Sequence, residues 1–122
     1  MRAHLEACLP QEGCGLLAGS ATIVQDVIPV TNAAQSPVRY RMDPREQLRA
    51  FDRIEHRGWE LLGIFHSHPL GPAGPSATDV AEAAYETTYI IWTHEHDDWQ
   101  AAGYWIDKGR ISEVKLYAAD GT

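Results

Sequence analysis

The stretch LLGIFHSHPLGPAGPSATDV, at residues 61–80, contains the signals that decide the fold. Its first five residues, 61–65, are apolar without alternation, which predicts a strand in the middle of a sheet. A loop rich in proline and glycine follows from Pro69 to Pro75. Ser76 then suits a helix N-cap, because an acidic residue follows it three positions later. The stretch therefore predicts a buried strand, a connecting loop and a helix over residues 76–86.

Hydrophobic patterns on both sides of this stretch predict a mixed α/β chain. Residues 2–8 are typical of the end of a helix, and a second helix begins after Asp43, where Pro44 suits the first helical position. In this second helix, Glu46 would complete a capping box and Gly58 would end the helix. Its apolar stripe is formed by Leu48, Phe51 and Ile54. Further strands are predicted at residues 15–19, 21–30, 39–42, 89–93, 100–106 and 111–118. We expect a mixed sheet of about six strands flanked by two or three helices.

Length and composition limit the kind of protein. A chain of 122 residues fits one domain, so we expect a single domain over residues 1–122. The formal charge of −7 argues against nucleic acid as a partner, because phosphate binding needs clustered positive charge. No apolar run approaches the roughly 20 residues that cross a bilayer, and the first residues lack a secretory apolar core. We therefore expect a cytoplasmic protein with no membrane contact, in which Cys8 and Cys14 are free thiols.

Three side chains have the spacing of a zinc site. His66 and His68 lie two positions apart at the end of the buried strand, so both imidazoles point to one face. Asp79 lies in the first turn of the following helix, where it can fold back toward the strand end. Two imidazoles and one carboxylate are a common set of zinc ligands that leaves the fourth position to water. We expect one Zn²⁺ per chain at this site.

A hydrolytic site also needs a proton carrier and a stabiliser for the developing oxyanion. Glu12, which precedes the first predicted strand, is the candidate general base. Gly13 and Gly15 beside it would allow a substrate chain or another backbone to approach closely. Ser76 could donate its hydroxyl to the oxyanion that forms when water attacks a carbonyl. Glu12 and Ser76 are therefore the predicted catalytic residues.

Each of these residues also has an ordinary structural interpretation. Ser76 with Asp79 is a common capping box, the two histidines could bond to carbonyls at a strand end, and Glu12 could be a polar residue before a strand. Only the ordered combination favours chemistry. The run HEHDD at residues 94–98 is a second cluster of metal-binding residue types, but it reads as a solvated hairpin loop that holds ligands less firmly.

The ordered set of Glu12, HSHP at residues 66–69, Ser76 and Asp79 resembles the JAMM signature of the MPN-domain metalloproteases. PQEGCGLLAG, residues 29–32, YRMDP and FHSHP also follow in the expected order, so the resemblance covers residues 4–118. It implies a cytidine-deaminase-like MPN fold, zinc held by the two histidines and the aspartate, and the same proton and oxyanion roles for Glu12 and Ser76. It also implies a further strand before the first helix, which here is missing or shortened.

The resemblance is strongest to the compact bacterial members, which cut after the C-terminal Gly-Gly of small ubiquitin-like or sulfur-carrier proteins. It implies such a carrier as partner and hydrolysis of a peptide or isopeptide bond as the reaction. Two other functions stay open: a non-catalytic module that binds carrier proteins around a structural zinc, and a JAMM-like protein associated with DNA repair. The substrate-binding residues, the leaving group and the oligomeric state, including a homodimer, are also open.

Overall fold

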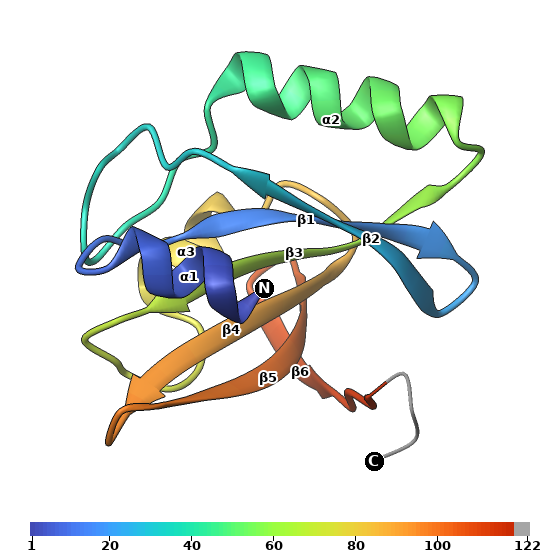
Figure 1. Ribbon diagram of the computed structural model, residues 1–122. Helices are drawn as coiled ribbons and strands as arrows, with labels where there is room; N and C mark the ends of the chain where they lie inside the picture. Colours follow the sequence, from blue (N-terminus) through green and yellow to red (C-terminus); the bar gives the residue numbers. More distant parts are fainter. Residues whose placement is uncertain (119–122) are drawn as a thin grey trace.

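The computed structural model describes residues 1–118 and contains one six-stranded mixed sheet with three helices (Figure 1). The strands lie in the order β2-β1-β3-β4-β5-β6, and only β3 and β4 run parallel. The elements in chain order are α1 Arg2–Cys8, β1 Cys14–Ser20, β2 Ile23–Val30, α2 Pro44–His56, β3 Glu60–His68, α3 Ala77–Glu82, β4 Thr88–Glu95, β5 Asp98–Asp107 and β6 Arg110–Val114. This architecture confirms the predicted α/β class and strand count.

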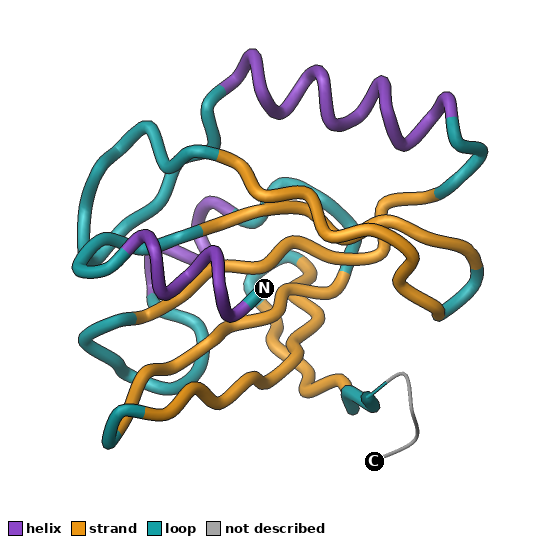
Figure 2. Tube along the Cα trace, in the orientation of Figure 1, coloured by secondary structure: helices purple, strands orange, loops and turns teal. Residues whose placement is uncertain are grey.

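Helices lie on both faces of the sheet (Figure 2). Its central strands send apolar side chains in both directions, into one core on each face. Along β1, Leu16 points toward α2 and packs in one core with Ile54, whereas Leu17 points to the opposite face and packs with Leu5 of α1. The last six residues of β3 are all buried. The continuous apolar run that predicted a central strand is therefore explained by burial on both faces.

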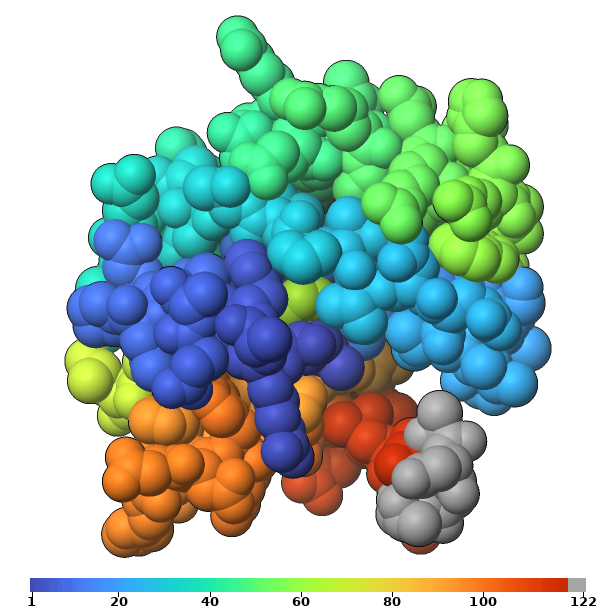
Figure 3. All heavy atoms as spheres, viewed as in Figure 1, coloured from blue at the N-terminus to red at the C-terminus, as the bar shows by residue number. Residues whose placement is uncertain are grey.

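Helix α1 is held against strands β4 and β5 by contacts with two tryptophans. The Trp99 indole N–H donates to Glu6 at 2.7 Å, and the Arg2 guanidinium lies 5.6 Å from the centre of the Trp92 ring. Figure 3 shows α1 (dark blue) seated against the part of the surface formed by β4 and β5 (orange). No helix within residues 1–118 is long enough and apolar enough to cross a membrane.

The segment at residues 39–42 is not a strand, which corrects one prediction. It forms only an isolated bridge between Asn32 and Met42. The side chain of Asn32 accepts from the Arg41 N–H and donates to the Arg39 carbonyl, each at 3.0 Å. These bonds take up backbone groups that a strand would have paired with a neighbouring strand.

The start of α2 also differs from its predicted capping. Asp43 is the N-cap, as expected, but Glu46 does not close a capping box. The Glu46 carboxylate instead accepts from the Thr31 N–H at 3.1 Å and ties the helix to the end of β2. Leu48 is 67% exposed, and the buried stripe runs through Ala50 and Ile54, because the helix rests on the sheet at a slightly different rotation.

Two later elements are shorter than predicted, and the HEHDD segment is largely strand. The helix that begins after Ser76 ends at Glu82 rather than at residue 86, and β6 ends at Val114 rather than at residue 118. Strands β4 and β5 extend into HEHDD, so only His96 and Asp97 form the turn, both at positive φ. The predicted hairpin is confirmed, with a tighter turn.

The two glycines near Glu12 do not leave room for a substrate, which was one of the two expected uses. The other, close approach of another backbone, is confirmed at Gly15, because a Cβ atom there would lie 2.6 Å from the Ile28 carbonyl oxygen. A Cβ atom on Gly15 would lie 2.4 Å from the Phe65 ring, and one on Gly13 would lie 2.7 Å from Leu5. The space beside each glycine is therefore already filled by a core side chain. These glycines permit close packing of the sheet, not access to the site.

Candidate metal centre

Strand β3 carries the two predicted histidine ligands into the interior at its C-terminal end. It lies between β1 and β4, where Cys14 pairs with His66 and Thr93 pairs with His68. His66 is 1% exposed and His68 4% exposed. Because neighbouring strands fix the backbone on both sides, the two imidazoles have little freedom to move apart.

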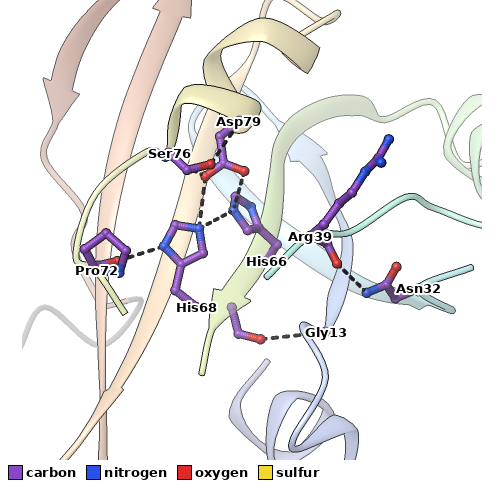
Figure 4. A network of polar contacts seen from close by, with 9 residues as sticks. Gly13, Asn32, Arg39, His66, His68, Pro72, Ser76 and Asp79 are labelled. Carbon is purple, nitrogen blue, oxygen red and sulfur yellow. Dashed lines mark hydrogen bonds and ion pairs between the residues drawn. The ribbon is translucent and has the colours of Figure 1, made fainter. Parts of the chain in front are cut away.

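Three donor atoms converge above this strand end (Figure 4). The Nε2 atoms of His66 and His68 are 3.1 Å apart. One Asp79 oxygen lies 3.2 Å from the Nε2 atom of His66, and the other lies 2.9 Å from that of His68. The structure therefore brings together the three side chains that the spacing predicted as ligands.

Helix α3 aims Asp79 at the histidines through its N-terminal cap. The Ser76 hydroxyl accepts from the Asp79 N–H at 3.0 Å, and an Asp79 carboxylate oxygen accepts from the Ser76 N–H at 2.9 Å. This reciprocal pair is the capping box that was the structural interpretation of these residues. The structural and the metal-binding interpretations of Asp79 are therefore compatible, because the carboxylate that closes the capping box also faces both imidazoles.

The hydrogen bonds of His68 show which nitrogen faces the centre with a lone pair. Its Nδ1 donates to the Pro72 carbonyl at 2.8 Å, since a carbonyl can only accept. A neutral His68 would therefore present an Nε2 lone pair to the Asp79 carboxylate, and two such acceptors need a cation between them. That cation is either a proton, which makes Nε2 a donor to Asp79, or a metal ion. The Nε2 atom of His66 lies at the same point, 3.2 Å from the other Asp79 oxygen.

The pKa shifts reflect this arrangement. Burial alone would lower the pKa of His68, but its hydrogen bonds to Asp79 and Pro72 outweigh burial and raise the pKa. Burial of His66 outweighs its bond to Asp79, so its pKa falls. Burial would raise the pKa of Asp79, but hydrogen bonds from both histidines hold it well below the usual range. The carboxylate stays ionised, which a metal ligand requires.

Glu12 lies close to the two histidines but makes no hydrogen bond to either imidazole. It is 3% exposed, and it offers a ligand atom that lies within 4.8 Å of one on each histidine. Its Oε1 atom has no hydrogen-bond partner. Burial raises the pKa of Glu12 to about 8, and the Asp79 charge adds to this while His68 opposes it. A carboxyl group with a pKa near neutrality is matched to proton transfer.

The donor set fits a tetrahedral zinc ion. Ligand atoms about 2.0–2.2 Å from a zinc ion at tetrahedral angles lie roughly 3.3 Å apart. The two Nε2 atoms are 3.1 Å apart, and each lies 3.2 or 2.9 Å from one of the two Asp79 oxygens, which is slightly shorter. The lone pairs that face one another supply the negative potential such an ion needs. The HEHDD segment does not gather three ligand atoms in this way among the described residues. His94 instead lies 4.5 Å from the Trp99 ring centre.

Two neighbours of the centre were not predicted. The Tyr40 ring stacks on His66 with centroids 4.4 Å apart and an interplanar angle of 25°. Ser67, between the two histidines, accepts from the Gly13 N–H at 2.9 Å. Both belong to segments noted for their resemblance, YRMDP and HSHP, but neither residue type signals such a role by itself.

The family model for prokaryotic homologs of the JAB domain matches residues 1–105. A probable TtuB-protein conjugate cleaving protease of Thermus thermophilus is 46% identical over 92 residues, which cover 75% of this chain and 62% of that protein. A desampylase of Pyrococcus furiosus is 38% identical over 86% of this chain and 74% of its own length. A CysO-cysteine peptidase of Mycobacterium tuberculosis is 34% identical over 93% of this chain and 80% of its own length.

Solved structures show the same fold. A solution structure of a protein from Desulfitobacterium hafniense superimposes with a TM-score of 0.82 at 39% identity, over 93% of this chain and 82% of that one. The crystal structure of a JAB1/MPN domain protein from Archaeoglobus fulgidus shares the fold, with a TM-score of 0.55 at 22% identity over 92% and 83% of the two chains. The chain belongs to the family of prokaryotic homologs of the JAB domain, within the JAMM/MPN proteins.

Proposed function

We propose that this protein is a zinc metallopeptidase that hydrolyses the peptide or isopeptide bond after the C-terminal Gly-Gly of a small ubiquitin-like or sulfur-carrier protein. The observation that carries the proposal is the convergence of His66, His68 and Asp79 beside a buried glutamate with a raised pKa. The names of its relatives, which include proteases of protein conjugates and a CysO-cysteine peptidase, support the same reaction class.

His66, His68 and Asp79 would hold one zinc ion. When bound, such an ion acts as a Lewis acid that acidifies water and polarises a carbonyl. Asp79 supplies negative charge to the set, and Pro72 keeps the lone pair of His68 on Nε2. The capping box keeps Asp79 aimed at this point, so the ligand geometry is set before any ion binds.

Glu12 would act as general base and then as general acid. It takes a proton from the attacking water and delivers it to the nitrogen of the leaving group when the C–N bond breaks. Its burial and its position close to both histidines suit this role better than a ligand role, because it makes no hydrogen bond to either imidazole. The neighbouring ligands therefore bind, whereas Glu12 moves protons.

Ser76 would donate its hydroxyl to the oxyanion that develops on the attacked carbonyl. Its oxygen already accepts from the Asp79 N–H, which leaves the hydroxyl hydrogen free to donate elsewhere. One such donor is typically worth about 3 kcal/mol of the barrier.

A glycine tail suits the depth of this centre. The two histidines are 1% and 4% exposed, so an extended chain must be thin to bring a carbonyl close to them. Glycine has no side chain to clash with the residues around the site. The partner would therefore be a carrier protein with a flexible Gly-Gly end.

The test is cleavage of a Gly-Gly fusion of a small carrier protein by zinc-loaded enzyme. We expect cleavage after the second glycine by the wild type and a loss of at least about a hundredfold in Glu12→Gln, because general acid–base catalysis contributes roughly that much. Glu113→Gln, an exposed site on β6, is the matched control and should keep full activity. Absence of cleavage by the wild type, or equal cleavage by Glu12→Gln, refutes the proposal.

The alternative of a non-catalytic binding module has one observation in its favour. Glu12 lies within 4.8 Å of the histidine ligand atoms, so it could close the shell as a fourth ligand, as in structural zinc sites. Zinc affinity distinguishes the two functions. A proton carrier leaves the affinity of Glu12→Gln unchanged within about threefold, whereas loss of a ligand weakens it far more.

Two further statements belong to the same proposal. We propose that residues 1–122 act as one domain, because the sheet and both cores run through the described residues without a break. The free thiols of Cys8 and Cys14 fit a reducing compartment, which supports the cytoplasm as the place of action.

A further inference from the structure

The backbone of Glu12 and Gly13 is fixed by hydrogen bonds, whereas the Glu12 Oε1 atom has none within the described residues. The Glu12 N–H donates to the Ser36 carbonyl at 2.8 Å, and the Glu12 carbonyl accepts from Asn32 Nδ2 at 3.0 Å. The next residue, Gly13, exchanges two bonds with Ser67, one at 2.9 Å to its hydroxyl and one at 3.0 Å from its N–H. Four backbone groups are thus fixed, and the carboxyl group takes its position from them.

One side chain, Asn32, makes all the hydrogen bonds that an amide can make. Its Nδ2 donates to the carbonyls of Glu12 and Arg39, and its Oδ1 accepts from the N–H groups of Ala34 and Arg41, each at 3.0 Å. Asn32 is 7% exposed. A buried amide with two donors and two acceptors all satisfied fixes the relative position of every group it joins.

The same amide holds the residue that stacks on a predicted metal ligand. The Arg39 carbonyl and the Arg41 N–H belong to the two peptide groups on either side of Tyr40. Both are bonded to Asn32, so the backbone of Tyr40 is fixed from both sides. Its ring lies on His66 at a centroid distance of 4.4 Å, and the His66 Nδ1 atom has no hydrogen-bond partner. Stacking therefore restricts the ring orientation of His66, which no hydrogen bond at its Nδ1 does.

We propose that Asn32 is a positioning residue that sets Glu12 against the metal centre and, through Tyr40, orients His66. It acts by joining two segments that are distant in sequence, the turn at residues 12–13 and the loop at residues 33–41, into one unit next to the end of β3. It touches neither substrate nor metal. The catalytic part of this inference rests on the proposed function, whereas the positioning of the backbone does not.

The first test uses amide hydrogen exchange and needs no activity. Asn32→Asp keeps the size and both acceptor bonds but replaces the donors to Glu12 and Arg39 with a carboxylate that repels their carbonyls. We expect the Glu12 N–H to exchange at least tenfold faster than in the wild type, with the β4 amides unchanged. Gln47→Glu is the matched control, a half-buried amide-to-acid change with the same charge difference. Equal exchange of the Glu12 N–H in Asn32→Asp and Gln47→Glu would overturn the inference.

The second test asks whether Asn32 acts through Glu12. In the wild-type background, Asn32→Asp should lower kcat at least tenfold while KM stays within twofold. At saturating zinc, which masks any effect of His66 on zinc affinity, the same change in the Glu12→Gln background should lower the residual kcat by less than twofold, because the carboxylate that it positions is already gone. An equal loss in both backgrounds means that Asn32 only supports the fold and overturns the inference. If Asn32→Asp does not fold, the neutral Asn32→Ser takes its place in both tests.

The third test follows the path through Tyr40 by zinc affinity, measured in competition with a chromogenic chelator. Tyr40→Phe keeps the stacked ring and should bind zinc as the wild type does. Tyr40→Leu removes it and should weaken binding about tenfold, the lower end of what outer-shell changes produce. Equal affinity of the two variants overturns this part. The proposed function and the positioning role can fail separately. If amide hydrogen exchange and zinc affinity behave as expected but the wild type cleaves no Gly-Gly substrate, the proposed function is refuted and the positioning role of Asn32 is not.

Discussion

Replacing Glu12 by glutamine should stabilise the metal-free protein, and the gain should grow with pH. The carboxyl group is 3% exposed, its Oε1 atom has no partner, and burial raises its pKa from 4.5 to about 8. Between these two values the folded state keeps a proton that the unfolded chain has released. Stability therefore falls as pH rises through this window, because the folded state must bind a proton or bury a charge.

The size of the effect follows from the displaced pKa. Each unit of displacement corresponds to about 1.4 kcal/mol. With the folded pKa at about 8, the carboxyl costs about 3 kcal/mol at pH 7 and about 5 kcal/mol well above pH 8, relative to a neutral side chain of the same shape. For a chain of this length, 3 kcal/mol corresponds to a rise in Tm of about 10 °C. At pH 4 both states hold the proton, and the difference should nearly vanish.

The assay is urea unfolding of chelator-treated protein at pH 4, 5.5, 7 and 8.5, with Glu12→Gln and the exposed control Glu113→Gln compared with the wild type. The difference for Glu12→Gln should increase steadily over this series, and that for Glu113→Gln should stay flat. A gain that is independent of pH, or a loss of stability at pH 8.5, would refute the account of Glu12 as a buried group with a raised pKa.

Three further changes test the ligands, the cap and the packing. Asp79→Asn should weaken zinc binding at least tenfold, as measured by chelator competition, because within residues 1–118 it removes the only carboxylate within 3.2 Å of both imidazoles. Ser76→Ala should lower kcat about a hundredfold or more but cost only about 1 kcal/mol in urea unfolding, since one oxyanion donor outweighs one helix cap. Gly15→Ala should destabilise the fold by about 1–3 kcal/mol in the same assay, because its Cβ would lie 2.4 Å from Phe65.

The fold was largely predictable because its strongest patterns are local. The apolar run at residues 61–65 and the cap at Ser76 each reflect a single rule, and both elements form where expected. The conformation of residues 39–42 was not predictable, because their backbone groups form hydrogen bonds with the side chain of Asn32 rather than with a neighbouring strand. Leu48 was misplaced because helical spacing alone does not fix the rotation of a helix on its sheet.

The residues of the candidate site were predictable where they are placed by one strand or one helix cap. They were less predictable where their position depends on contacts between distant parts of the chain. His66 and His68 share a face because strands alternate, and Asp79 follows from the helix cap. Nothing local indicates that Tyr40 lies on His66, since 26 positions separate them in the sequence. Glu12 was found through the order of motifs and not through its surroundings, which only the packed structure provides.

The unsatisfied atoms of the interior argue that this centre is not a by-product of packing. Three buried side-chain atoms among the described residues lack a hydrogen bond, and one of them, Asp26 Oδ2, has an ion pair with Arg53 at 2.8 Å. The other two are Glu12 Oε1 and His66 Nδ1, both at the same centre. A buried polar atom without a partner costs about 1–3 kcal/mol, so folding alone would disfavour two of them in one place. Packing gives no reason for two such residues side by side, whereas a site for proton transfer and metal binding requires both.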